Sequence, residues 1–147
     1  MIKVLIQTAG GSSERRVYDE RTLEYKETRK FHQSPPYPYP YGFILGTYSD
    51  DGGCVDCYVI THEPLAAGSI VECEPVGLLE QHEGDEIDHK ILATVPGEVI
   101  ELNQDVVEKL RNFIYAAFAQ SPDGYIAVGD LLPREQALEH IQEHLAT

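Results

Sequence analysis

Long apolar runs, basic residues and cysteines are all scarce in this sequence. No stretch approaches 18 consecutive apolar residues, so no membrane-spanning segment is predicted. Lysine and arginine total 11 against 25 aspartates and glutamates, which gives a net charge of −14. This balance opposes binding to nucleic-acid backbones and to anionic membrane surfaces. An acidic chain can still bind an anion through a metal cation that lies between the two.

The three cysteines, Cys54, Cys57 and Cys73, are odd in number and argue against a disulfide framework. Cys54 and Cys57 have the C-x-x-C spacing of redox and zinc sites, but positions three apart in a strand face opposite sides. We expect buried, inert thiols, with metal or redox use as the alternative. The N-terminal MIKVLIQTAGG lacks a long apolar core followed by a cleavage site, and we interpret it as a strand of a cytoplasmic protein.

Strand patterns dominate the first hundred residues, which are rich in β-branched and aromatic side chains. We expect strands over residues 2–7, 22–28, 43–48, 55–61, 69–79 and 87–95. Turn sequences such as DDGG and HEGDE separate them. Short strands at this spacing favour an antiparallel barrel or sandwich.

The last third of the chain changes to a helical period. Asn103 is a suitable N-cap for an apolar pattern from Val106 to Phe118. A short strand follows at YIAV, and Pro133 suits the first turn of a second helix. A barrel with two helices packed on one side needs no second domain, so residues 1–147 are expected to form a single domain. The buried stripe of the second helix is expected at Ala137, Leu138, Ile141 and Leu145.

Two histidines, His140 and His144, lie four positions apart on the second expected helix, a spacing that zinc enzymes use. Ile141 rather than glutamate follows His140, so the H-E-x-x-H pattern is absent. We expect both histidines to face solvent, with a zinc site as the alternative.

Carboxylates gather in and beside the expected strands, at Asp51, Asp56, Glu83, Asp85 and Asp88. Period-two alternation places Asp88 and Lys90 on one face of their strand, and Asp56 and Tyr58 on one face of theirs. A surface location explains any single carboxylate, but converging carboxylates repel one another unless protons or cations intervene. Hard divalent cations with oxygen ligands, above all Mg²⁺, fit that need.

Three motifs occur in a fixed order: Tyr-Pro-x-x-Tyr-Gly at 37–42, Asp-x-x-x-x-Asp at 51–56 and Asp-x-Lys at 88–90. Their order and spacing resemble the soluble inorganic pyrophosphatases of the OB-barrel family, over most of the chain. The resemblance implies a mainly β fold with α, an OB-like five-stranded antiparallel barrel with two C-terminal helices packed on it. It implies Mg²⁺-dependent hydrolysis of pyrophosphate to two phosphates, with Mn²⁺ or another divalent cation as the alternative.

The resemblance assigns the metal-binding residues one by one. Asp51, Asp56 and Asp88 match the aspartates that hold the first metal, and Asp56 would also bridge to the second. Glu83 stands where the family has an aspartate that helps bind a metal arriving with substrate. Tyr41 matches a tyrosine that is hydrogen-bonded near the nucleophilic water. Two metals that share this water would lower its pKa.

Phosphate-binding residues follow from the same resemblance. Arg29 and Lys90 match basic residues near phosphate, and Arg16, or Arg15, falls where the family has a phosphate-binding lysine. Tyr115 aligns with the tyrosine of a Tyr-Lys pair that contacts phosphate. Binding of single-stranded nucleic acid by such a barrel would need a basic groove, which the charge balance opposes.

The chain departs from the family pattern on the active face. Gly53 occupies the place of the aspartate that orients the nucleophilic water and accepts its proton, and glycine can do neither. Gln7 stands where a metal-associated glutamate is expected, and Ala116 where a phosphate-contacting lysine is expected. We therefore expect impaired or altered activity. The alternative is an inactive relative that binds metal or phosphate or serves assembly. Bacterial members usually form hexamers, which implies a homo-oligomer.

Overall fold

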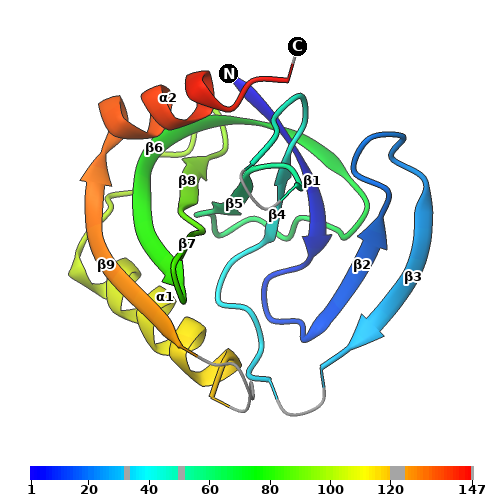
Figure 1. The fold of residues 1–147 in the computed structure, drawn as a ribbon, viewed down its shortest axis with the longest axis horizontal. Coiled ribbons are helices and arrows are strands. Elements are labelled where there is room, and N and C mark those ends of the chain that lie inside the picture. The colour runs from blue at the N-terminus through cyan, green and yellow to red at the C-terminus, as the bar shows by residue number, and fades with distance from the viewer. Residues whose placement is uncertain (32–33, 50–51, 120–124, 147) are drawn as a thin grey trace.

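A closed barrel of five strands forms the centre of the computed structural model, which describes residues 1–31, 34–49, 52–119 and 125–146 (Figure 1). Each barrel strand is hydrogen-bonded to the next, and the last pairs with the first, so the sheet closes. In spatial order the strands are β1 (Ile2–Thr8), β4 (Tyr41–Ile44), β5 (Asp56–Val59), β8 (Lys90–Thr94) and β6 (Ile70–Glu83). The predicted OB-like barrel is confirmed.

One pairing in the barrel is parallel. Strands β5 and β8 run in the same direction, whereas the other four barrel pairings are antiparallel, as expected for the whole barrel. Parallel neighbours need a crossover connection, and β6 supplies it between β5 and β8. Cys57 is in register with Ile91 across this pair. The residues that precede them, Asp56 and Lys90, therefore become neighbours.

The remaining strands lie outside the barrel. Strands β2 (Glu14–Tyr18) and β3 (Tyr25–Lys30) form a separate two-stranded sheet beside β1, and β9 (Ile126–Pro133) and the short β7 (Glu86–Ile87) pair with β6 (Figure 1). The sequence analysis did not predict β2. Its sequence ERRVY lacks apolar alternation, and pairing with β3 stabilises it instead.

Strand β6 is 14 residues long and curves around the barrel (Figure 1). Its register shifts between Pro75 and Gly77 against β8, and between Leu79 and Gln81 against β9. Such irregularities bend a strand and increase its twist, which lets one strand pair with β1, β8, β9 and β7 in turn.

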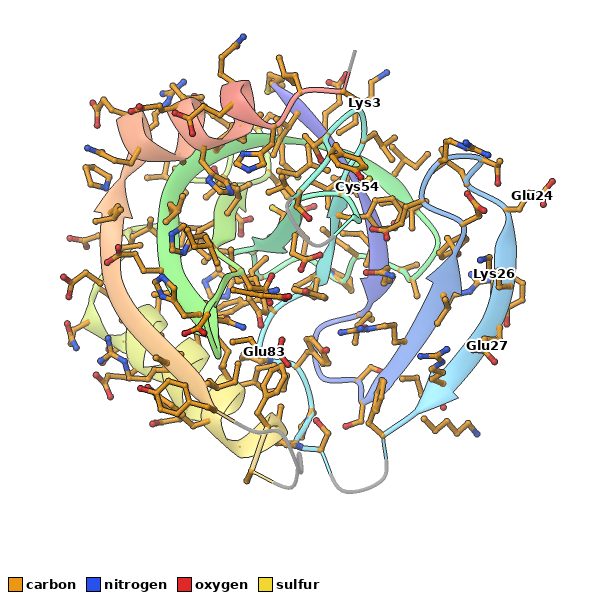
Figure 2. The ribbon with its side chains drawn as sticks, viewed as in Figure 1. Lys3, Glu24, Lys26, Glu27, Cys54 and Glu83 are labelled. Atoms are coloured by element: carbon orange, nitrogen blue, oxygen red, sulfur yellow. The ribbon has the colours of Figure 1, made fainter. Side chains whose placement is uncertain are left out.

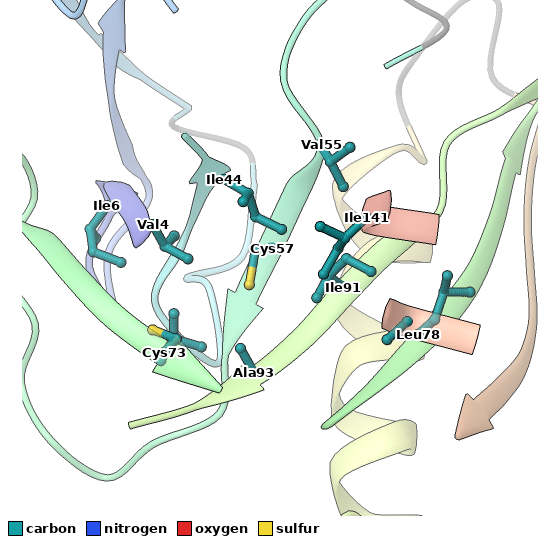
Figure 3. Packing of buried hydrophobic residues seen from close by; sticks show 12 residues of the cluster. Val4, Ile6, Ile44, Val55, Cys57, Cys73, Leu78, Ile91, Ala93 and Ile141 are labelled. Carbon is teal, nitrogen blue, oxygen red and sulfur yellow. The ribbon is translucent and has the colours of Figure 1, made fainter. Parts of the chain in front are cut away.

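Strand alternation divides the apolar side chains into two cores. The first fills the barrel with side chains from all five strands, among them Val4, Ile44, Cys57 and Ile91, and helix α2 (Arg134–Glu143) closes one end with Ile141 (Figure 3). The second core lies on the outer face, where helix α1 (Gln104–Ala117) covers β4, β5, β6 and β8. Tyr41, Tyr58 and Leu92 belong to this outer core, together with Leu110 and Phe113 of α1.

Both predicted helices are present, and α1 begins as expected. Asn103 Oδ1 accepts a hydrogen bond from the Val106 N–H at 3.1 Å. The predicted stripe of α2 is correct at Ala137 and Ile141 but wrong at Leu138 and Leu145, which are 44% and 48% exposed. Leu145 lies beyond the helix end, so helical spacing does not apply to it. Neither described helix combines the length and apolarity needed to cross a bilayer.

We expect Asn103→Ala to lower the free energy of unfolding by about 1 kcal/mol, because it removes the side-chain cap of α1. Urea denaturation followed by circular dichroism measures the change. Asn112→Ala is the matched control, since Asn112 is an exposed residue inside the same helix and alanine favours helix there. Equal losses in the two variants would show that the cap does not stabilise α1.

Candidate active site

The ammonium group of Lys90 joins three of the predicted site residues. Lys90 Nζ donates to Asp56 Oδ2 at 2.6 Å, to Asp88 Oδ1 at 3.1 Å and to the Tyr41 hydroxyl at 3.2 Å. The parallel register of β5 and β8 places Asp56 beside Lys90, and Asp88 shares the face of Lys90 two positions earlier. Tyr41 reaches the group from β4, directly opposite Tyr58 of β5. We call Tyr41, Asp56, Asp88 and Lys90 the Lys90 cluster.

Burial gives this cluster its electrostatic character. The Lys90 side chain is 6% exposed, and those of Asp56 and Asp88 are each 22% exposed. Burial by itself would lower the pKa of Lys90, but Asp56, Tyr41 and Asp88 outweigh it and hold this pKa well above its ordinary value. Burial, with Asp56 adding to it, also raises the pKa of Tyr41. At neutral pH the cluster therefore holds a charged lysine and a protonated tyrosine.

The structure places Arg15 beside the cluster and Arg16 away from it. Arg15 Nη2 donates to the Tyr37 hydroxyl at 2.8 Å, and its guanidinium lies 5.4 Å from the centre of the Tyr41 ring. Arg16 Nη1 instead donates to the Ala67 carbonyl at 3.1 Å. Adjacent residues of a strand face opposite sides, so only one of the two can face Tyr41. Arg15 is thus the arginine placed to meet an anion at the cluster.

Three other predicted residues lie outside the Lys90 cluster. Arg29 lies on the exposed strand β3 opposite Arg15, and its Nε donates to Glu27 at 2.7 Å. Glu83 is exposed at the end of β6 and pairs with Glu86 of β7 (Figure 2). The Tyr115 hydroxyl accepts a hydrogen bond from the Val128 N–H at 3.0 Å, which ties α1 to β9.

The chemistry of the donors in the cluster fits a hard divalent cation. Asp56 and Asp88 both approach one ammonium group, so their oxygens converge on a common region. Carboxylate oxygens are ligands that Mg²⁺ prefers. Asp51, the third predicted metal ligand, lies outside the described residues. Within the described ranges no group of three His, Cys, Asp or Glu residues has metal-binding geometry.

His140 of α2 and His144 at its C-cap face the cluster rather than solvent, which corrects the expectation for them. His140 and His144 are half-buried, and with Asp56 and Asp88 they line a narrow cleft. Their ring centres are 4.3 Å apart, and the His140 ring is 5.7 Å from that of His89. Burial lowers the pKa of His89, whose Nδ1 accepts from the Gln81 N–H at 3.0 Å. Helical spacing could not show where α2 docks.

All three cysteines are free thiols, and Cys57 and Cys73 are buried in the barrel core. Cys54, labelled in Figure 2, is half-buried, and its backbone N–H donates to Glu20 Oε1 at 3.3 Å. Burial raises the pKa of both Cys54 and Cys73 to about 11. The prediction of buried thiols is thus correct for Cys57 and Cys73 and wrong for Cys54, and the raised pKa values disfavour the reactive thiolate form.

The closed sheet makes this protein an OB-like barrel protein, and the Lys90 cluster lies on the outer face of the barrel. Comparison with known proteins defines the family. The family model described as inorganic pyrophosphatase matches residues 4–146. A protein of Aquifex pyrophilus named inorganic pyrophosphatase is 31% identical, over 97% of this chain and 86% of its own length. The chain therefore belongs to the inorganic pyrophosphatase family.

Further relatives agree with this assignment. An inorganic pyrophosphatase of Nostoc is 39% identical over a shorter region, 63% of this chain and 55% of that protein. The solved structure of an inorganic pyrophosphatase from Coxiella burnetii superposes with a TM-score of 0.87 at 20% identity. It covers 97% of this chain and 91% of the other, which supports the same fold.

We expect Lys90→Met to lower the free energy of unfolding by about 3 kcal/mol, because it leaves two partly buried carboxylates without their cation. Lys3→Met is the matched control, since it makes the same replacement at an exposed lysine. Chemical denaturation of both variants at pH 7 measures the two costs. Similar costs would mean that the ion pairs of Lys90 contribute little.

The contribution of Lys90 should depend on pH at the alkaline end. Its pKa is raised in the folded protein, so its stabilisation is complete below the ordinary lysine value, about 10.4, and decreases as pH rises through the raised pKa. The difference in unfolding free energy between wild type and Lys90→Met should therefore shrink above about pH 10.4. Denaturation curves at several pH values from neutral to strongly alkaline test this. A constant difference would contradict it.

Proposed function

We propose that this protein hydrolyses pyrophosphate to two phosphates with Mg²⁺ as cofactor. The observation that carries the proposal is the Lys90 cluster, in which one buried ammonium group joins Asp56, Asp88 and Tyr41. Membership of the inorganic pyrophosphatase family supports the same activity. Several relatives carry this activity as their name.

Each residue of the cluster has a role that its contacts support. Lys90 orients both carboxylates and offsets part of their charge, which lowers their mutual repulsion. The Tyr41 hydroxyl stays protonated and can donate a hydrogen bond to an oxygen at the site. Arg15 stands beside Tyr41 and would bind a phosphate oxygen, since its guanidinium remains charged there. Lys90 and Arg15 are thus the two cations that we expect to lie next to the substrate phosphates.

Asp56 and Asp88 would hold Mg²⁺, with Asp51 as a third ligand and Glu83 as a ligand to a further ion. When bound, such ions lower the pKa of a water and neutralise phosphate charge. Mn²⁺ is the alternative cofactor. Arg29, Arg16 and Tyr115 are further candidates for phosphate binding, and they would need to move from the hydrogen bonds described above.

A reduced rate is part of the proposal. Gly53 has no side chain to accept a proton from water, and its carbonyl accepts a hydrogen bond from the Ser49 N–H at 2.6 Å. Gln7 is buried in β1 and is uncharged, and Ala116 offers no cation. Loss of a positioned general base costs a factor of about 10² to 10⁴ in rate. We therefore place the activity below that of a chain with the full signature.

Location and assembly belong to the same proposal. We propose a single domain that acts in the cytoplasm as a homo-oligomer, in line with the family resemblance. Its net charge of −14 gives no support to nucleic acid as a partner.

Phosphate release from pyrophosphate with Mg²⁺, measured by a malachite-green assay, tests the activity. We expect release by the wild type and none by Asp56→Ala, which removes a carboxylate of the cluster. Asp130→Ala is the matched control, since Asp130 is exposed on β9, and it should retain wild-type activity. Wild-type release no greater than that of Asp56→Ala would refute the proposal.

Gly53→Asp is expected to raise the rate by on the order of a hundredfold, because it restores a carboxylate where water would be activated. Position 53 is the one that the family resemblance assigns to this aspartate, whereas the neighbouring Gly52 has a φ of 92° that disfavours other residues. The same phosphate assay measures the gain. An unchanged rate would show that the losses at Gln7 and Ala116 limit the reaction.

A further inference from the structure

The narrow cleft between α2 and the barrel is lined mainly by side chains that can bind a metal ion. His140 and His144 line it from α2 and its C-cap, and Asp56 and Asp88 line it from the barrel side. Its volume of about 10 Å³ is close to that of one water-sized sphere. The cleft therefore has room for a single water or ion and not for an organic ligand.

The two histidines of this cleft are placed to share one ion. Their ring centres are 4.3 Å apart. Two imidazoles that bind the same ion, each at about 2.0–2.1 Å, have ring centres roughly 4.5 to 5 Å apart. A small rotation of either side chain is enough to reach this arrangement. The spacing of four positions is also the one by which a helix brings two histidines to one zinc ion.

A hydrogen bond fixes the tautomer of His144 in the form that a metal ligand needs. Its Nδ1 lies 2.7 Å from the His140 carbonyl oxygen. A carbonyl oxygen only accepts hydrogen bonds, so Nδ1 carries the proton and donates it. The lone pair of the neutral ring is then on Nε2. Histidines that bind metals commonly donate their second ring N–H to a carbonyl or carboxylate in this way.

His89 has the opposite tautomer, which excludes it as an Nε2 ligand. Its Nδ1 accepts a hydrogen bond from the Gln81 N–H at 3.0 Å, so the proton of the neutral ring is on Nε2. Among the described residues no group of three His, Cys, Asp or Glu side chains has metal-binding geometry, which agrees with a site of two histidines. Water would fill the other coordination positions of the ion.

We propose that His140 and His144 bind one divalent transition-metal ion of the Zn²⁺ class, with ligands other than those proposed for Mg²⁺. Imidazole nitrogen suits Zn²⁺ and related ions, whereas Mg²⁺ prefers oxygen. Asp56 and Asp88 line the same cleft, and their negative charge favours a cation there. The inference does not depend on the proposed hydrolysis, because it concerns metal binding alone.

Isothermal titration calorimetry of the full chain with Zn²⁺, in excess Mg²⁺, tests the site. Wild type should show a Zn²⁺ site that Mg²⁺ does not displace. His144→Gln removes one ligand and should weaken Zn²⁺ binding by at least about tenfold, since even a group that only orients a ligand contributes about 10- to 100-fold to metal affinity. His140→Gln should show the same loss. His62→Gln, at an exposed position outside the cleft, is the matched control and should bind like wild type.

Urea denaturation followed by circular dichroism gives a second measurement and shows which variants fold. Zn²⁺ that binds the folded chain should raise the urea midpoint of wild type and of His62→Gln. The midpoints of His140→Gln and His144→Gln should stay unchanged at the same Zn²⁺ concentration. Each of these two variants removes one ligand of the same ion, so either of them completes the test if the other does not fold.

The inference is overturned if wild type binds no Zn²⁺ in excess Mg²⁺, or if the folded histidine variants bind Zn²⁺ as tightly as wild type. In the second case, loss of binding in Asp56→Ala would place the ion at the carboxylates. Loss in Cys54→Ser would place it at the thiol that also lines the cleft. Zn²⁺ binding lost only in the histidine variants, without release of phosphate from pyrophosphate, would support this site and refute the proposed hydrolysis alone.

Discussion

The 2.6 Å ion pair between Lys90 and Asp56 is the interaction on which the candidate site depends. It exists because β5 and β8 are parallel and in register, which places one residue of opposite charge on each strand side by side. The same register sends Cys57 and Ile91, the residues that follow, into the barrel. One pairing therefore fixes both a core contact and a charged contact. Asp88, two positions before Lys90, accepts a second hydrogen bond from the ammonium group, and Tyr41 of the neighbouring strand β4 accepts a third.

The cluster also explains how a chain of net charge −14 can receive an anion. Lys90 offsets one of its two carboxylates, and Arg15 stands next to Tyr41. A divalent cation held by the carboxylates would complete the change of local sign. A few cations at the site can therefore attract an anion although the net charge of the chain is −14.

The grouping of Asp88 with Lys90 could be predicted from the sequence, because alternation along one strand needs no knowledge of the neighbouring strands. Alternation put Asp88 and Lys90 on one face, and the order of motifs indicated the barrel. Alternation could not choose between Arg15 and Arg16, since the side that the β2–β3 hairpin turns to the barrel depends on tertiary packing.

The crossover through β6 has a consequence for how the molecule folds. Lys90 and Asp56 are 34 residues apart, and their strands become neighbours only when β6 has carried the chain across the barrel and back. Contacts between distant segments form slowly, since the chain between them must first be ordered. Until β8 docks, Asp56 remains a solvated carboxylate on an edge strand. The ion pair between Lys90 and Asp56 thus forms only when β8 docks beside β5, so the charged centre is completed late, together with the parallel pairing of the barrel.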